Sequence, residues 1–386
     1  MGRVVGVPPP IEPRRLPETA AVLEVRLAVR RWLREFGADG AGAVAVALSG
    51  GADSLALTAA AVVEAPQVDA LIVDHGLQEG SAEVAGEAAR VASALGCRSA
   101  RVLAVSVGSE GGMEAAARRA RYAALDAARA GAPVLLGHTL DDQAETVLLG
   151  LARGSGGRSI RGMATYTEPW GRPLLGVRRA VTRALCADLA LRPYEDPHNS
   201  APEFTRVRVR HEVLPLLEDV LGGGVAEALA RTASHLREDG AVLDALAEEL
   251  LDRAIRNGAR PGAFEGADFG GGEGDGDFEA ADSAGQGGGA FEGGLLESGG
   301  GDEITLSVEI LATAPDALRR RAIRLWLLRG GAKALTDKHL RAVDALVTAW
   351  RGQGGVAVGG GPSGRARSGT RLVAAREHGR LTLRGR

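Results

Sequence analysis

The sequence predicts an α/β protein with a doubly wound parallel sheet, followed by a helical connector and a small α+β C-terminal domain. Three observations predict it. Short apolar segments alternate with helical ones along residues 43–151, polar glycine-containing motifs end several of the apolar segments, and composition and charge change abruptly near residue 262. Strands that alternate with helices favour a parallel sheet covered on both faces. Ligands of such sheets bind at the carboxyl ends of the strands.

The first half of the chain shows the alternation element by element. Apolar residues at helical spacing predict a first helix over residues 19–36. The strand-like segments are 44–48, 70–74, 102–107 and 134–137. The helical segments that follow them are 55–64, 81–95, 113–130 and 141–151. Ser81 is expected to cap its helix.

The domain boundaries follow from composition. Residues 1–18 are a proline-rich tail that we expect to be flexible, 19–220 form the α/β domain, and 221–261 form a helical connector. Residues 262–303 are rich in glycine and acid and nearly free of β-branched residues, which predicts a disordered insertion. Residues 304–386 form the last domain, with helices at 314–329 and 336–350 and strands at 356–358, 372–374 and 381–383.

The net charge of −3 conceals an asymmetry. Residues 262–303 contain eleven Asp and Glu and no Lys or Arg, whereas residues 304–386 contain sixteen Lys and Arg against five Asp and Glu. A module this basic favours a polyanionic partner such as nucleic acid. A solvated, arginine-rich surface is the alternative explanation, since the whole chain has only two lysines.

Several classes of protein are disfavoured. Cys97 and Cys186 form no Cys-x-x-Cys motif, which argues against a disulfide framework and against zinc or iron–sulfur sites. The N-terminus has three consecutive prolines and no apolar core, unlike a signal peptide. No apolar stretch reaches the roughly 18 residues of a membrane helix. We therefore expect a cytoplasmic enzyme that does not enter a membrane.

The most informative motif is Ser-Gly-Gly-Ala-Asp-Ser, residues 49–54, between a strand-like and a helix-like segment. Two glycines let the backbone turn tightly and approach a ligand. Successive N–H groups and the positive end of the next helix favour an anion. A capped helix without ligand is the alternative for a lone Gly-Gly. Here every position resembles the pyrophosphatase loop, Ser-Gly-Gly-X-Asp-Ser, of the ATP-pyrophosphatase superfamily, whose members cleave ATP between the α and β phosphates.

Further motifs follow in order. They are Val-Asp-His-Gly-Leu (73–77), Ala-Arg-Arg-Ala-Arg-Tyr (117–122), Gly-His-Thr-Leu-Asp-Asp-Gln-Ala-Glu-Thr (137–146), Arg-Gly-Ser-Gly (153–156), Arg-Pro-Leu-Leu (172–175), Tyr-Glu-Asp-Pro-His-Asn (194–199) and Phe-Thr-Arg-Val-Arg-Val-Arg (204–210). Together they resemble the tRNA(Ile)-lysidine synthetase family, and residues 318–326 and 339–354 look like that family's substrate-binding domain. The resemblance covers everything except the tail and the acidic insertion.

The resemblance implies a reaction. ATP, with Mg²⁺, adenylates the C2 oxygen of the wobble cytidine of an isoleucine tRNA with anticodon CAU and releases pyrophosphate. The ε-amine of free L-lysine then attacks C2, AMP leaves, and lysidine is formed, so that the tRNA reads AUA rather than AUG. The partners implied are this tRNA and L-lysine, and a homo-oligomer is possible. No Ser–His–Asp or Cys–His set is apparent in the sequence, and none is needed when the substrate brings its own nucleophile.

The resemblance also assigns roles to residues. ATP phosphates are expected on the loop residues Ser49, Gly50, Gly51, Ala52, Asp53 and Ser54, with Mg²⁺ held through ATP and Asp53. Asp142 and Glu145, three residues apart and so on one helix face, match carboxylates that hold the lysine amines. Arg118 matches an arginine near the lysine carboxylate. His75 and His138 could contact nucleotide or satisfy backbone groups, and the sequence does not separate the two.

The tRNA-binding candidates are arginines. Arg206, Arg208 and Arg210 alternate, so in an extended segment they would face one side and suit phosphate, whereas on a helix they would scatter. In the basic domain the candidates are Arg319, Arg320 and Arg324.

Two features depart from the family pattern. Thr139 stands where relatives usually have a second histidine, and we expect this protein to do without the further C-terminal domain of longer relatives. One alternative is another tRNA-modifying enzyme of the superfamily, although thiolation enzymes need sulfur-carrying cysteines, commonly in a Cys-x-x-Cys motif, which this chain lacks. The other is a catalytically silent RNA-binding relative.

Overall fold

The structure is a computed structural model of the 386-residue chain. It describes residues 16–37, 42–76, 80–108, 112–154, 156–196, 203–256, 304–359 and 372–385. The predicted acidic insertion and nearly all of the predicted tail lie outside these ranges. The chain divides into two compact units, residues 1–239 and 240–386. Within the described residues no helix is long and apolar enough to cross a bilayer.

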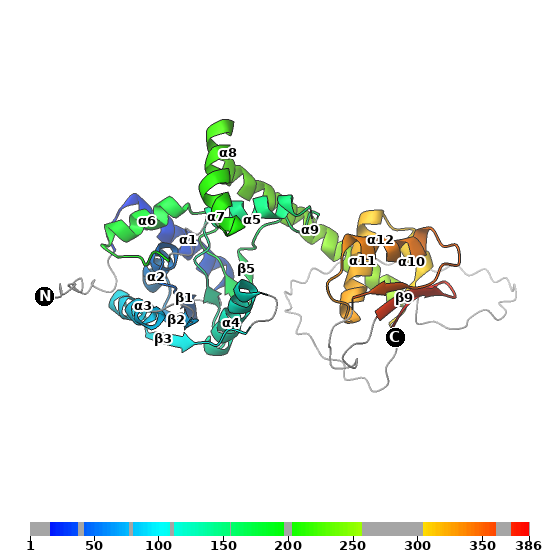
Figure 1. Cartoon of the computed structure of the whole chain (residues 1–386), viewed down its shortest axis with the longest axis horizontal. Coiled ribbons are helices and arrows are strands. Elements are labelled where there is room, and N and C mark those ends of the chain that lie inside the picture. Colours follow the sequence, from blue (N-terminus) through cyan, green and yellow to red (C-terminus); the bar gives the residue numbers. More distant parts are fainter. Residues whose placement is uncertain are drawn as a thin grey trace, which may run out of the picture. The chain divides into compact units, whose positions relative to one another are not determined.

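The first unit is built on a six-stranded sheet with strand order β3-β2-β1-β4-β6-β5 (Figure 1). Its strands are β1 (Ala43–Ala47), β2 (Gln67–Asp74), β3 (Ser99–Ala104), β4 (Val134–Leu135), β5 (Tyr166–Thr167) and β6 (Trp170–Gly171). All neighbours pair in parallel except β5, which lies antiparallel to β6. The chain passes from β1 outward through β2 to β3 and returns to β4 on the other side of β1. The strand order therefore reverses beside β1, the position at which such sheets bind ligands.

Helices cover both faces of this sheet. They are α1 (Ala20–Phe36), α2 (Ala52–Glu64), α3 (Ser81–Leu95), α4 (Met113–Ala128), α5 (Leu140–Ala152) and α6 (Arg179–Asp188). Helices α1, α2 and α6 contact one another and share one core cluster with α3, whereas Leu125 of α4 belongs to a cluster on the opposite face. Three further segments, α7 (Thr205–Arg208), the π-helical turn η2 (Val209–Val213) and α8 (Leu214–Leu221), precede the long helix α9 (Val225–Arg256). The predicted doubly wound α/β architecture is confirmed.

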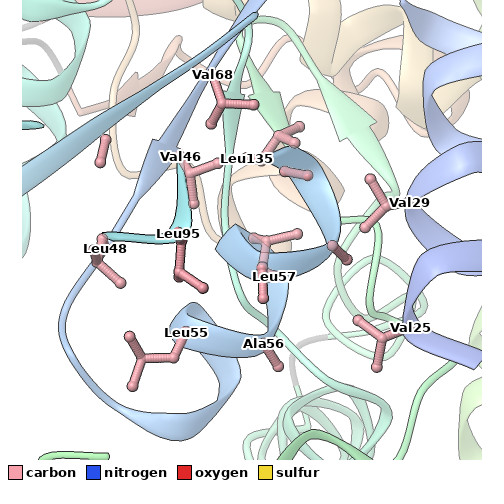
Figure 2. Packing of buried hydrophobic residues seen from close by; sticks show 14 of the residues in the cluster. Val25, Val29, Val46, Leu48, Leu55, Ala56, Leu57, Val68, Leu95 and Leu135 are labelled. Carbon is pink, nitrogen blue, oxygen red and sulfur yellow. The ribbon is translucent and has the colours of Figure 1, made fainter. Parts of the chain in front are cut away.

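The alternation of β1 explains how the two faces are filled. Val46 and the following Leu48 face α1 and α2, where they pack with Leu57 and Val29 (Figure 2). The alternate residues of β1 are alanines and belong to the opposite cluster. Successive side chains of a strand point to opposite faces. Burial of each such Val or Leu contributes about 1.5–3 kcal/mol, so this core holds the loop after β1 on a stable support.

The structure corrects one prediction on the first unit and decides between two alternatives. Ser81 does not cap α3, because the N-cap position is Gly80 with φ of 83°, a conformation that favours glycine, and Ser81 is the first helical residue. Residues 205–213 are helical, so of the two alternatives for Arg206, Arg208 and Arg210 the helical one, in which the side chains scatter, holds. Helix α6 and the short strands β5 and β6 were not predicted, because two-residue strands show no period.

The second unit contains a four-stranded antiparallel sheet of order β7-β10-β9-β8 and helices α10, α11 and α12. Their bounds are β7 (Leu306–Ser307), α10 (Val308–Ala312), α11 (Asp316–Arg329), α12 (Asp337–Thr348), β8 (Val356–Val358), β9 (Leu372–Glu377) and β10 (Arg380–Gly385). Its core gathers Leu251 of α9, Trp326 of α11 and Leu346 of α12, and the Trp326 indole N–H donates to the carbonyl oxygen of Ile304 at 2.8 Å. The predicted small α+β module is confirmed.

Candidate active site

The loop between β1 and α2 is closed by its own serines. The Ser54 hydroxyl donates to the Gly51 carbonyl at 2.9 Å, accepts from the Ser49 backbone N–H at 3.2 Å and lies 3.1 Å from the Ser49 hydroxyl. Gly50 has φ of 84°, which favours glycine. Gly51 is the N-cap of α2 and no side chain caps that helix. The N–H groups of the first turn, which begins at Ala52, therefore remain available to an anion.

Strand β4 ends against this loop. A Cβ on Gly137 would lie 3.0 Å from the carbonyl carbon of Asp53 and 3.0 Å from the nitrogen of Ser54. Only a residue without a side chain allows so close an approach of two backbones. The strand order reverses between the neighbours β1 and β4, where such sheets bind ligands. The close approach at Gly137 therefore places residues 137–146 beside the loop of residues 49–54.

A cavity of about 430 Å³ opens next to the loop. Its lining includes Ser49 and Gly51 of the loop, the apolar side chains of Leu48 and Ile72, and the residues after β2 that include His75. The Nδ1 atom of His75 is buried and has no hydrogen-bond partner among the described residues. Burial, and then the charge of Arg121, lower the pKa of His75, so its ring favours the neutral form. A cavity with both apolar and polar lining beside a loop suited to anions fits a nucleotide.

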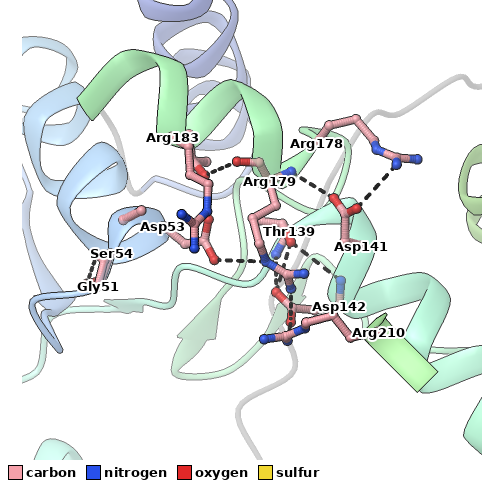
Figure 3. Close-up of polar contacts among 12 residues, drawn as sticks. Gly51, Asp53, Ser54, Thr139, Asp141, Asp142, Arg178, Arg179, Arg183 and Arg210 are labelled. Atoms are coloured by element: carbon pink, nitrogen blue, oxygen red, sulfur yellow. Dashed lines mark hydrogen bonds and ion pairs between the residues drawn. The ribbon is translucent and has the colours of Figure 1, made fainter. Parts of the chain in front are cut away.

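Asp53 points from the first turn of α2 towards α6. One carboxylate oxygen accepts a hydrogen bond from the Thr182 hydroxyl at 2.5 Å, and the other lies 3.5 Å from Nε of Arg179 (Figure 3). Burial raises the pKa of Asp53, and the contacts with Thr182 and Arg179 oppose that shift.

Asp142 and Glu145, which we call the acid pair, lie on α5 as the sequence predicts, and arginines surround them. Nη2 of Arg179 lies 2.7 Å from Oδ1 of Asp142 (Figure 3). Nη1 of Arg179 lies 3.3 Å from Oε1 of Glu145. Arg210 reaches both residues, at 3.2 Å from Asp142 and 2.7 Å from Glu145. The Glu145 side chain is fully buried. The acid pair is thus a buried pair of carboxylates whose charge is compensated by guanidinium groups, so a cationic ligand would have to share or replace these partners.

The local structure of α5 orients the first carboxylate. Thr139 is the N-cap, and its backbone N–H donates to Oδ2 of Asp142 at 2.8 Å in a capping box. Although burial opposes it, the pKa of Asp142 is lowered by the charge of Arg179 and by the Thr139 N–H. Thr139, the departure from the family pattern, therefore acts as a helix cap in this chain.

The helical course of residues 205–213 separates the three arginines predicted for tRNA. Arg210 points to the acid pair, as described, and Nε of Arg206 lies 3.4 Å from Oε2 of Glu145. Arg208 is exposed and pairs with Glu212 at 2.8 Å. The structure thus brings Arg206 and Arg210 to the acid pair and leaves only Arg208 of the three outside this network.

Two further predicted site residues lie outside the loop of residues 49–54. His138 follows β4, and Arg118 lies on α4. Nδ1 of His138 is buried and has no partner among the described residues, so it does not satisfy a backbone group. Burial lowers the pKa of His138 to about 4, with Asp142 opposing and three arginines, among them Arg118, adding to the shift. Arg118 is exposed, and its Nη2 donates to the Tyr122 hydroxyl at 3.2 Å.

The basic residues predicted for tRNA in the second unit differ in exposure. Arg319 is 4 % exposed and forms ion pairs of 2.6 Å with both Asp344 and Asp316, so its predicted contact with tRNA does not fit its position. Arg319 instead ties α11 to α12. Arg320 and Arg324 are partly exposed on α11.

Sequence reasoning missed the contribution of α6. Arg179 joins Asp53 to the acid pair, and its backbone N–H also donates to the Asp141 carboxylate at 2.7 Å. Thr182, one turn later, holds Asp53. The consecutive arginines 178 and 179, shortly after the Arg-Pro-Leu-Leu motif, are the sequence feature that could have drawn attention to this helix.

The residues present fit ATP, and they fit Mg²⁺ only through ATP. The loop with its open helix N-terminus, the neighbouring cavity and the unpartnered His75 Nδ1 suit a nucleotide. No group of three or more His, Cys, Asp or Glu side chains among the described residues could enclose a metal ion. Mg²⁺ is commonly bound by one or two carboxylates together with substrate phosphates.

Comparison with known proteins agrees with this geometry. A family profile described as a PP-loop domain (ATP_bind_3) matches residues 25–217, and one described as the TilS substrate binding domain matches residues 306–382. The fold, the loop and these matches define the chain as a PP-loop ATP-binding protein with a second, substrate-binding domain.

The relatives specify the family. A tRNA(Ile)-lysidine synthase from Nocardia farcinica is 67% identical over 360 residues, which cover 93% of this chain and 97% of that protein. Enzymes of the same name from Rhodococcus erythropolis and Mycobacterium tuberculosis (strain H37Rv) are 60% and 54% identical, over 95% of this chain and 97% and 98% of theirs. The chain belongs to the tRNA(Ile)-lysidine synthase family, so the resemblance inferred from the motifs is confirmed.

Proposed function

We propose that this chain is a ligase that joins free L-lysine to C2 of the wobble cytidine of a CAU-anticodon tRNA(Ile), through an adenylated cytidine, with release of pyrophosphate and AMP. Membership of the tRNA(Ile)-lysidine synthase family supports the reaction. The single structural observation that carries it is the acid pair beside the PP-loop, because a buried dicarboxylate centre suits a substrate with ammonium groups. Reaction in the cytoplasm and assembly into homo-oligomers stay predictions.

In this proposal the chain positions substrates and compensates charge, and the nucleophile is the lysine amine. Residues 49–54 would hold the ATP phosphates, and Mg²⁺, when bound with ATP, would neutralise charge on the departing pyrophosphate. Asp53 would hold this assembly from α2, since Thr182 and Arg179 fix its carboxylate. Preorganised contacts of this kind lower the barrier without a protein nucleophile.

The lysine amines would bind at the acid pair in exchange for guanidinium contacts. Arg179 and Arg210 occupy both carboxylates in the free protein, so the arriving ammonium groups would share or displace them. The exchange conserves local charge, because one cation replaces another. The neutral state of the attacking amine would follow from proton transfer to a carboxylate of the pair or to solvent.

The basic second unit would bind the tRNA. Its family profile is that of a substrate-binding domain, and residues 304–386 carry an excess of eleven positive charges. Arg320 and Arg324 are the proposed contacts on α11, together with Arg208 of the first unit.

The test is ATP-dependent incorporation of labelled lysine into a CAU-anticodon tRNA(Ile) transcript, with Asp142→Ala as the paired variant. Incorporation that requires ATP and is lost in the variant is the expected result. ATP cleavage without lysine incorporation would indicate another tRNA-modifying activity. Binding of tRNA without any release of pyrophosphate would indicate an RNA-binding relative without catalysis.

A further inference from the structure

Three arginines near the site lack acidic partners. Arg118 and Arg121 lie three residues apart on α4, and Arg172 follows β6. We call these three residues the arginine cluster. Across the described ranges none of them forms an ion pair with a carboxylate, which distinguishes them from Arg179 and Arg210.

The three side chains gather around Tyr122. Nη2 of Arg118 donates to the Tyr122 hydroxyl at 3.2 Å and its guanidinium lies 4.9 Å from the ring centre. Tyr122 also acts on Arg172, whose pKa is lowered by burial and raised by this tyrosine. After burial itself, the charge of Arg118 is among the causes that lower the pKa of Arg121 and of Arg172. The cluster is therefore a set of mutually repelling cations held at short range.

Arg172 is fixed in place but incompletely satisfied. Its Nη1 donates to the Ala164 carbonyl at 3.1 Å, which anchors the guanidinium, while its Nε is buried and has no partner within the part of the chain that is described. The neighbouring His138 Nδ1 is buried and unpartnered in the same way. An unmade hydrogen bond at a buried, charged donor is costly, so such groups usually indicate a missing ligand.

The cluster also borders both substrate regions. Arg121 lines the cavity of about 430 Å³ beside the PP-loop. The charges of all three arginines act on His138, on which the charge of Asp142 acts with the opposite sign. A molecule bound between cluster and acid pair would therefore meet positive charge at one end and negative charge at the other.

We propose that the arginine cluster is an oxyanion-binding subsite of the reaction, in which Arg172 and Arg121 complete the contact that family resemblance assigned to Arg118 alone. An oxyanion would accept hydrogen bonds from the unpaired guanidinium groups and remove their mutual repulsion. Two substrate groups have this chemistry, the carboxylate of the amino acid and the phosphoryl oxygens of ATP. The proposal rests on the proposed function, which supplies both substrates.

The experiment compares the wild type with Arg172→Gln, Arg172→Lys and Arg121→Gln. Arg90→Gln on α3 serves as the control, because Arg90 is exposed and pairs only locally with Glu87. Three quantities are measured: KM for lysine against kcat, KM for ATP with tRNA-dependent pyrophosphate release in the absence of lysine, and the preference for lysine over lysinamide, which lacks the carboxylate. Thermal unfolding is recorded for each variant.

We expect Arg172→Gln to raise one KM by about tenfold or more, consistent with loss of a charge-assisted bidentate contact. If the carboxylate is the ligand, KM for lysine rises, the preference over lysinamide disappears and pyrophosphate release is retained. If phosphate is the ligand, KM for ATP rises or pyrophosphate release falls, and the preference over lysinamide persists. Arg172→Lys should recover part of either loss, which a merely structural role would not produce.

Values within about twofold of the wild type for both KM and the lysinamide preference, in both Arg172→Gln and Arg121→Gln, would overturn the proposal. If Arg172→Gln fails to fold, Arg121→Gln decides, because Arg121 forms no hydrogen bond or ion pair with the described residues that its loss would break. Failure of the proposed function is distinct, since then the wild type itself would incorporate no lysine. Protection against unfolding by inorganic pyrophosphate would in that case still test the cluster.

Discussion

The acid pair and the arginine cluster lie near the same histidine and differ in how their charges are compensated. Arg179 and Arg210 neutralise the two carboxylates at distances of 2.7 to 3.3 Å. The arginine cluster has a tyrosine hydroxyl and a backbone carbonyl as partners, but no carboxylate among the described residues. Both groups act on the pKa of His138, with opposite signs.

This difference indicates what each region needs from a substrate. A pair of carboxylates that is already compensated gains little binding energy from one more cation. A ligand must replace one of its guanidinium partners, so the pair selects ligands that resemble that cation. An uncompensated centre gains directly from a ligand of opposite charge, because that ligand removes repulsion as well as forming bonds. The acid pair should therefore determine which cation is accepted, and the arginine cluster should contribute affinity for the anionic group.

The largest effect is expected from Glu145→Gln. The substitution keeps the shape of the side chain but leaves the guanidinium groups of Arg179 and Arg210 short of negative charge in a fully buried position. Lysidine formation should fall by about 10³-fold, the scale found when a buried charged contact of the transition state is lost. Labelled lysine incorporation measures it, with Glu212→Gln as the control, since Glu212 pairs on the surface with Arg208. A loss below about tenfold would show that the acid pair is not the amine site.

His138 should make stability depend on pH. Its pKa in the folded protein is about 4, below the ordinary 6.5, so the folded state stays neutral while the unfolded state takes up a proton. Stability is therefore complete above pH 6.5 and is lost as the pH falls towards 4, by up to about 3 kcal/mol. His138→Gln should flatten this loss, as measured by denaturant unfolding between pH 7 and pH 4.5.

The control for that measurement is His235→Gln, an exposed position on α9. Its unfolding curve should follow that of the wild type at every pH. Equal slopes for wild type and His138→Gln would mean that burial, with the charges around it, does not keep this histidine neutral in the folded protein.

Gly137→Ala should affect catalysis through the backbone. The new Cβ would lie 3.0 Å from backbone atoms of Asp53 and Ser54, so either the loop or β4 must move by a few tenths of an ångström. A displacement of that size should lower the rate of tRNA-dependent pyrophosphate release by about tenfold. Gly176→Ala is the matched control, because nothing lies within 4 Å of a Cβ there. If the two variants behave alike, the close approach of Gly137 to the backbone of Asp53 and Ser54 is not required for pyrophosphate release.

Sequence reasoning reached the fold and one half of the site. The elements from β1 to α5 could be recognised because short apolar segments alternate with helical ones, and the loop motif is local, so residues 49–54 and the acid pair could be recognised too. Partners distant in sequence could not be derived. Nothing in the residues around Arg179 shows that α6 will lie across Asp53 and α5, because that contact depends on the packing of α6 on α1 and α2.

The arginines predicted for tRNA show the same limit. The alternation of Arg206, Arg208 and Arg210 places the three side chains on one face only if the backbone is extended. In this chain the tertiary packing of Val209 and Leu214 favours a helix. Arg319 was likewise predicted from the basic composition of its domain to face tRNA. It is instead buried and forms an ion pair with Asp344 on the neighbouring helix. The charge of a side chain is known from the sequence. Which opposite charge pairs with it depends on contacts between residues that are distant in the sequence.

The smallest effect is expected from Arg208→Gln, which lies outside both charged regions. Its pair with Glu212 is exposed and screened by solvent, so the stability of the protein should not change measurably. Because Arg208 is the member of its trio not held by the acid pair, it is the one available to a phosphate of the tRNA. Its loss should weaken tRNA binding and reduce the slope of log K against log salt by about one. If the slope of log K against log salt is unchanged, Arg208 does not contact a tRNA phosphate and is a solvated surface residue.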